Sequence, residues 1–281
     1  MKRHLTTILF FIYFVAVNGQ SHLNIAPVFD EPKRWTQMFT AAHLEGKYLK
    51  PYNLTLFKSM TTTDHRNYDE MERLVEKDGK TVGRIQGIIQ KTHNEMTGEK
   101  RIRFSRFDCI DDREVSSALF SALEDYALKS GFDTVCGPLG YSDLEREGLL
   151  IEGFDYNAPM ASLYTHPYYI AHYERYGLRK EMDWIEYQIT PPKEAPEKMR
   201  RLVGFVEQRY NLHTVKVKNS RELRKRYGYT YFDVLDAAYQ KLYNYQPMTD
   251  RQKQYYCKMY FPILNFDFVT MVANENDEII I

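Results

Sequence analysis

Two apolar runs on either side of an Asp-Gly pair constrain this sequence most. Residues 70–90 read EMERLVEKDGKTVGRIQGIIQ, with Asp78-Gly79 at the centre. Asp-Gly is a preferred pair in the tight turn that joins two antiparallel strands. The stretch therefore predicts a β-hairpin, and the residues that follow must complete its sheet.

Strand and helix patterns alternate after this hairpin. Apolar residues at 115–126 recur every three or four positions, which is typical of a helix packed on one side. The expected elements are a strand at 101–110, a helix from 113 to 130, a strand at 132–136, a helix at 166–176 and a strand at 178–189. This order predicts an α/β protein of the α+β kind, with a mixed sheet and helices on its faces.

The strand at 101–110 carries large side chains at both odd and even positions. Strict alternation places Phe104 and Arg106 on one face, and Ser105 and Phe107 on the other. We therefore expect both faces of this strand to be covered.

The following helix has a clear start signal. Asp111 is expected to cap it, and Glu114, three residues later, completes a capping box. Acidic residues at this position also complement the positive end of the helix dipole.

Charge and cysteine content exclude several function classes. The 281 residues include 38 Lys and Arg and 38 Asp and Glu, so the formal charge is zero. General nucleic-acid binders carry a basic excess, so we expect no nucleic-acid partner. Cys109, Cys136 and Cys257 are widely spaced and form no Cys-x-x-Cys pair. We therefore expect no metal site of that kind.

The N-terminus allows two interpretations. Residues 1–20, MKRHLTTILFFIYFVAVNGQ, have two early cations, an apolar run and small residues near Gly19, as a secretory signal does. The apolar run is too short for a membrane span, so we expect none. The same residues are equally good material for a first β-strand.

Four blocks in the sequence resemble a bacterial group within the GNAT (GCN5-related N-acetyltransferase) superfamily. They are VGRIQGIIQKTHNE, IRFSRFDCIDDREVSSALF, GPLGYSDLEREGLLIEGFD and YERYGLRKEMDWIEYQI. The resemblance implies an acyl-CoA N-acyltransferase-like fold, with acyl-CoA held between two splayed strands of a mixed sheet. It also implies two such halves in tandem, of which the first is complete and the second partial in this chain.

The resemblance divides the chain as follows. Residues 1–20 are a signal-like or first-strand segment, and 21–190 form the GNAT-like N-terminal domain. Residues 191–198, PPKEAPEK, are a proline-bearing linker, and 199–281 are an incomplete second half that stops within a hairpin at Asn276-Asp277. A strand left unpaired at this end predicts self-association.

Acyl-CoA would need its pyrophosphate held by backbone amides at a helix start. In this superfamily that place follows the long central strand, and here it is occupied by residues 111–116. Arg113 and Ser116 are the cofactor-binding candidates there. The acids beside them favour a structural cap over a CoA site.

The catalytic candidates are Tyr173, Asp143 and Glu147. Tyr173 stands four residues before Gly177, which matches the position of the superfamily's acid for the leaving thiolate. The alternative is a tyrosine packed on the sheet. Asp143 and Glu147 lie in CGPLGYSDLEREGLLIEGFD, residues 136–155, where either is a candidate base for an acceptor ammonium. The alternative for both is a solvated loop.

These features predict a GNAT-like N-acyltransferase that moves an acetyl or other acyl group from acyl-CoA to a small-molecule primary amine, without a metal. The alternative is a non-catalytic module that binds a small molecule or a partner on a degenerate acetyltransferase scaffold. We expect a cytoplasmic location, because acetyl-CoA is a cytosolic cofactor. Export behind a signal ending near Gly19 is the alternative.

Overall fold

The structure is a computed structural model that describes residues 8–15, 25–27, 68–78, 80–158, 162–190, 192–261 and 264–281. The chain divides into two compact units, Met1–Ile189 and Thr190–Ile281. Each unit is described by itself below. Among the described residues, no helix has the length and apolar character needed to cross a membrane.

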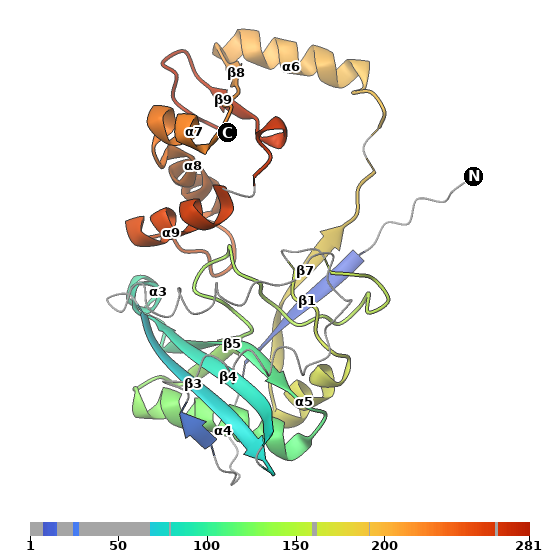
Figure 1. The fold of residues 1–281 in the computed structure, drawn as a ribbon, viewed down its shortest axis with the longest axis vertical. Coiled ribbons are helices and arrows are strands. Elements are labelled where there is room, and N and C mark those ends of the chain that lie inside the picture. The colour runs from blue at the N-terminus through green and yellow to red at the C-terminus, as the bar shows by residue number, and fades with distance from the viewer. Residues whose placement is uncertain are drawn as a thin grey trace, which may run out of the picture. The chain divides into compact units, whose positions relative to one another are not determined.

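The first unit is built on one mixed sheet (Figure 1). Its described strands follow the order β2-β3-β4-β5-β6-β1-β7. The pair β5 and β6 is parallel, and the other neighbours are antiparallel. The strands are β1 (Ile8–Val15), β2 (Ile25–Pro27), β3 (Tyr68–Lys77), β4 (Lys80–Gln90), β5 (Arg101–Cys109), β6 (Thr134–Gly137) and β7 (Arg179–Tyr187). The helices are α3 (Lys91–Thr97), α4 (Arg113–Lys129) and α5 (Tyr168–Tyr176).

The predicted fold class is confirmed by this sheet. β3 and β4 pair as the expected hairpin, with Lys77 opposite Lys80 and Asp78 in the left-handed region at φ 53°. α5 ends at Gly177, whose φ of 97° suits glycine. The parallel pairing of β5 and β6 covers only the first residues of each strand, from Arg101 to Arg103 on β5.

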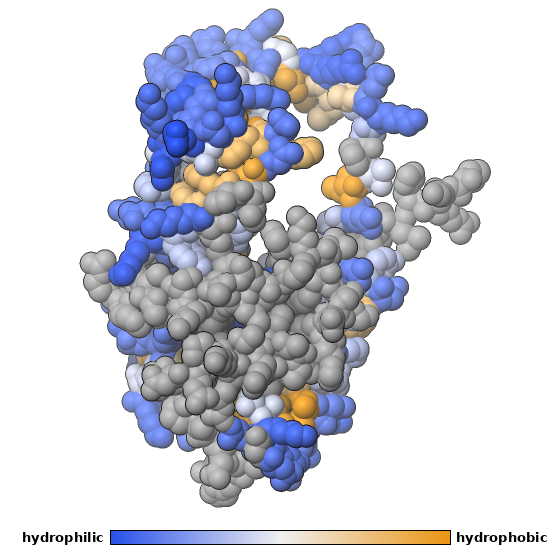
Figure 2. All heavy atoms as spheres, viewed as in Figure 1, coloured by the Kyte–Doolittle hydropathy of each residue, from blue (hydrophilic) through white to orange (hydrophobic). Residues whose placement is uncertain are grey.

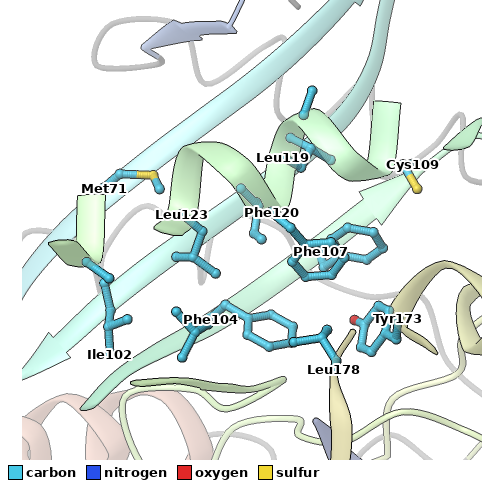
Figure 3. Packing of buried hydrophobic residues seen from close by; sticks show 14 of the residues in the cluster. Met71, Ile102, Phe104, Phe107, Cys109, Leu119, Phe120, Leu123, Tyr173 and Leu178 are labelled. Carbon is cyan, nitrogen blue, oxygen red and sulfur yellow. The ribbon is translucent and has the colours of Figure 1, made fainter. Parts of the chain in front are cut away.

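α4 and α5 pack against one face of the sheet and enclose an aromatic core (Figure 3). Phe120 of α4 stacks on Phe107 with ring centroids 4.8 Å apart, and it meets Phe104 edge-on at 5.6 Å. Tyr173 of α5 closes the group, 5.3 Å from Phe120.

The predicted alternation along β5 is wrong beyond Ser105, because the strand contains a bulge. Arg106 adopts a φ of 51°, and the register with β4 shifts between Arg84 and Gln86. An extra residue in a strand reverses the side-chain alternation after it. Phe107 therefore joins Phe104 on the α4 side, while Arg106 turns to the opposite face.

The second unit is mainly helical, with a small sheet. β8 and β9 pair antiparallel, with Val215 opposite Met271. The expected C-terminal hairpin is confirmed, because Ala273 of β9 bridges to Ile279 across a turn that contains Asp277 at φ 61°. Its elements are α6 (Glu197–Tyr210), β8 (His213–Val215), α7 (Ser220–Tyr227), α8 (Thr230–Tyr239), α9 (Asp250–Tyr260), η2 (Phe266–Phe268) and β9 (Met271–Ala273).

The close approach of α4 to β4 makes a stability prediction. A Cβ atom at Gly87 would lie 2.8 Å from Leu123 Cδ1, which is buried and cannot move freely. Gly87→Ala should therefore lower the free energy of unfolding of the first unit by about 1–3 kcal/mol, as overpacking does. Gly204→Ala in α6 is the control, because nothing lies within 4 Å of its Cβ position. It should raise helix stability by up to about 1 kcal/mol. Urea denaturation measures the free energy of unfolding of both variants. An equal change in the two variants would contradict the close packing of Gly87 against Leu123.

Candidate functional site

The face of the first sheet that points away from α4 is polar and buried. Alternation along β4 sends Ile85 and Ile89 into the aromatic core and Gln86 and Gln90 to the other side. The polar sheet face comprises the buried side chains Arg84, Gln86, Gln90, Arg103, Ser105 and Asp108. Burying so many polar groups is costly unless each finds a partner, so their contacts define the site.

A buried hydrogen-bond chain crosses this face. It links Glu70, Gln86, Arg106, Tyr141 and Glu145, which we call the polar cluster. Gln86 donates to the Tyr141 hydroxyl at 2.8 Å and accepts from Arg106 Nη1 at 2.9 Å. Tyr141 in turn donates to Glu70, and Arg106 Nη2 pairs with Glu145 Oε2 at 3.1 Å. These hydrogen bonds thus join three strands, β3, β4 and β5, and the loop after β6 into one network.

Glu145 is the member of the cluster that holds the loop. Burial raises the pKa of its carboxyl, and the adjacent Arg106 guanidinium acts in the opposite direction. The same carboxylate accepts from the backbone N–H of Tyr141 at 3.2 Å. A Cβ atom at Gly140 would overlap the side chain of Glu145, whose Cβ atom would lie only 2.6 Å away, so the close fit requires glycine there. The Gly140 carbonyl accepts from Arg103 at 3.3 Å.

Asp143 and Glu147 belong to this same loop. Both are half-buried. Desolvation raises the pKa of Asp143 to about 6, although the positive charge of Arg103 opposes the shift. A carboxyl group with this pKa is ionised at neutral pH and can accept a proton. The structure therefore brings Asp143 toward the polar sheet face.

Tyr173 lies on the other side of the sheet. Its side chain is buried against Phe104 at 5.8 Å and Phe107 at 5.1 Å between ring centroids. Desolvation raises the pKa of its hydroxyl well above the ordinary range. The structure does not bring Tyr173 together with Asp143 and Glu147.

At the start of α4, a side chain of the protein itself accepts a hydrogen bond from a free backbone N–H group. Asp112, and not Asp111, is the cap, because its carboxylate accepts from the Glu114 N–H at 2.9 Å. The expected capping residue was therefore wrong by one position. Asp112 has the extended backbone that a cap needs, and it also pairs with Lys77 at 2.8 Å.

Arg113 and Ser116, the cofactor-binding candidates, differ in their surroundings. Arg113 is exposed, whereas Ser116 is buried. Ser116 Oγ lies 2.9 Å from His172 Nδ1, and His172 Nε2 lies 3.1 Å from Asp111. Burial lowers the pKa of His172, and Asp111 opposes the shift.

The residues at the start of α4 do not fit a pyrophosphate. Three carboxylates, Asp111, Asp112 and Glu114, would face its negative charge. The Ser116 hydroxyl is already held inside the protein by His172. Elsewhere in the described part of the chain, no group of three or more His, Cys, Asp or Glu is placed to hold a metal ion.

Sequence reasoning missed the polar cluster. Glu70 and Tyr141 meet although they are 71 positions apart. One signal was present, because Gln86 and Gln90 lie four positions apart in the stretch IQGIIQ at 85–90, so alternation places both on the same face of the strand. Two amides on one face of a central strand indicate a buried polar face.

The fold described above is a mixed sheet with one buried polar face. Comparison with known proteins finds one matching family model and two similar curated proteins. Residues 12–97 match the model of a family described as "Family of unknown function (DUF6108)". Protein YghO of Escherichia coli K12 is 28% identical over 183 residues, which cover 64% of this chain and 45% of that protein. The bacterial ceramide synthase of Caulobacter vibrioides is 33% identical over 132 residues, 46% of this chain and 34% of that protein.

The chain is thus homologous to parts of both curated relatives, and it spans less than half the length of each. A solved structure of a functionally unknown conserved protein from Staphylococcus epidermidis aligns with a TM-score of 0.35 and 12% identity. That alignment covers 63% of this chain and 59% of the other.

The contact between Arg106 and Glu145 makes a second prediction. Arg106→Met leaves a buried carboxylate without its cation, which costs about 3–5 kcal/mol of unfolding free energy. The double variant Arg106→Met with Glu145→Gln should recover part of this loss, because the buried charge is removed. Arg113→Met removes an exposed cation and should change stability by less than about 0.5 kcal/mol. A double variant no more stable than the single one would contradict the pairing.

Proposed function

We propose that this chain takes part in N-acyl transfer, in which an acyl group from acetyl-CoA or another acyl-CoA passes to a primary amine. The observation that carries the proposal is the 33% identity with a bacterial ceramide synthase over 132 residues. A ceramide is an amide of a long-chain amino alcohol and a fatty acid, so its synthesis joins an acyl group to an amine. The mixed sheet and the carboxylates of the loop after β6 support the proposal.

Asp143 is the residue we propose as the base. An acceptor amine is protonated at neutral pH and must lose a proton before its nitrogen can attack an acyl carbon. A half-buried carboxylate with a pKa of about 6 is ionised at pH 7 and is better matched to this task than a solvated aspartate. Glu147, on the same loop, is the second candidate.

Tyr173 and the start of α4 take no part in the proposed chemistry. Tyr173 is only 1% exposed and is surrounded by aromatic rings, so a substrate would have to open the core to reach it. The acids at 111–114 oppose a pyrophosphate there. We therefore propose that acyl-CoA is held outside residues 111–116, and we assign no residue to its phosphates.

Replacement of Asp143 tests this proposal. Asp143→Asn should lower kcat/KM for acyl transfer by about 10²–10⁴-fold, because it removes the proton acceptor. Activity of the unchanged protein should rise with pH through about 6, as Asp143 loses its proton. Asp155→Asn, an exposed position further along the same segment, is the matched control and should keep full activity.

The assay combines the purified chain with acetyl-CoA or long-chain acyl-CoA and a panel of amines that includes a long-chain amino alcohol. Release of free CoA thiol and the mass of the amide product are measured together. If no donor and amine pair gives an amide, or if Asp143→Asn has no effect, the proposed role of Asp143 is wrong.

A binding module without catalysis is the second candidate function. The closed start of α4, where Ser116 is held by His172, favours it because the superfamily's CoA site would have been lost there. Isothermal titration separates the two functions. The binding module is supported if titration with an amine gives a heat of binding, titration with acetyl-CoA gives none, and no amide product forms.

We also propose that the chain acts in the cytoplasm, where acyl-CoA is available. In support, Ile8–Val15 form β1, which pairs with β7 from Ile8 opposite Tyr187 to Val15 opposite Arg179. Cleavage after Gly19 would remove this strand from the sheet. Mass spectrometry of the N-terminal peptide from the native cell decides between retention and export.

A further inference from the structure

α6 carries an apolar stripe that remains exposed among the described residues of its own unit. Met199, Leu202, Val203, Val206 and Tyr210 follow a spacing of three and four residues, which places them on one side of the helix. Met199, Leu202, Val203 and Tyr210 are each between 51% and 58% exposed. α6 has no buried residue at all, and apolar residues lie beside charged ones along it, at the top of the view in Figure 2.

An uncovered helix of this length is not stable by itself. Helices shorter than about 12–15 residues are marginal in water, and most gain their stability by packing an apolar side. α6 has 14 residues, so its stripe needs a surface to pack against.

The charged residues on and around α6 indicate that this surface is anionic. Residues 192–226 contain eleven Lys and Arg against four Glu, whereas the whole chain has 38 cations and 38 anions. All eleven cations are exposed, although Arg200, Arg201 and Arg226 also pair with carboxylates of the chain. On α6 itself, Lys198, Arg200, Arg201 and Arg209 outnumber Glu197 and Glu207. An excess of cations opposes pairing of α6 with a second copy of itself and favours an anionic surface.

We propose that α6 docks on the surface of an anionic lipid bilayer. The apolar stripe enters the boundary between headgroups and acyl chains, while the flanking cations contact the anionic headgroups. Arg209 lies over the rings of Phe205 and Tyr210, at 5.8 and 5.4 Å from their centroids, so its charge stays beside the stripe. This docking is independent of the proposed acyl transfer.

Vesicle sedimentation with the full chain tests the docking. The protein should bind vesicles of phosphatidylcholine and phosphatidylglycerol in equal parts, bind vesicles of phosphatidylcholine alone much more weakly, and lose binding as salt increases. Leu202→Asp and Gln208→Asp form the matched pair, because they add the same charge to the same helix. Leu202 is in the stripe, and Gln208 lies on the opposite side.

Leu202→Asp should bind about tenfold more weakly than Gln208→Asp, because only Leu202 contributes apolar area to the contact. Circular dichroism checks that both variants keep their fold. Equal binding by the two variants, or no binding of the unchanged chain to anionic vesicles, overturns the proposal. So does a dimer in sedimentation velocity that Leu202→Asp dissolves, because the stripe would then be covered by a second copy. The experiment uses no acyl donor or amine, so its failure is distinct from failure of acyl transfer.

Discussion

The left-handed backbone at Arg106 decides what each face of the first sheet contains. Without the bulge, Phe107 would lie beneath the loop after β6, and Arg106 would point into the aromatic core. With it, Phe107 stacks on Phe120, and Arg106 reaches both Gln86 and Glu145. A positive φ at arginine is uncommon, so the surrounding contacts must offset its cost. The stacked ring on one face and the ion pair on the other are those contacts.

The polar sheet face links this backbone feature to chemistry. Because Arg106 holds Glu145 and Arg103 holds the Gly140 carbonyl, the loop after β6 is fixed against a buried surface and kept from full contact with water. Partial desolvation of that loop is what raises the pKa of Asp143 to about 6. Two features of the sequence that looked separate, a strand with alternating glutamines and a loop rich in acids, are therefore parts of one electrostatic arrangement.

Sequence reasoning succeeded where local rules govern the chain and failed where distant residues meet. Asp78-Gly79 placed the β3 and β4 hairpin correctly because turn preference depends on neighbouring residues. Alternation failed at Arg106, since no local signal marks arginine for a positive φ. The sequence offered two adjacent aspartates as caps, and the structure uses Asp112, which also pairs with Lys77 from 35 positions earlier. The polar cluster could not be predicted for the same reason, because Glu70 and Tyr141 come together only in the folded sheet.

The start of α4 shows how resemblance and local chemistry can diverge. The resemblance assigns a phosphate site to this position, and the fold does place a helix start there. The side chains present are nevertheless those that stabilise a helix start without a ligand: a capping aspartate, further acids near the positive dipole end and a serine held by a histidine. The zero net charge of the chain likewise does not describe each segment of it. Salt screens charges in water beyond about 8 Å at physiological ionic strength, so a binding partner responds to the local excess of cations in residues 192–226 and not to the total. In both places, the arrangement of charges over a few residues says more about binding than the fold or the overall composition does.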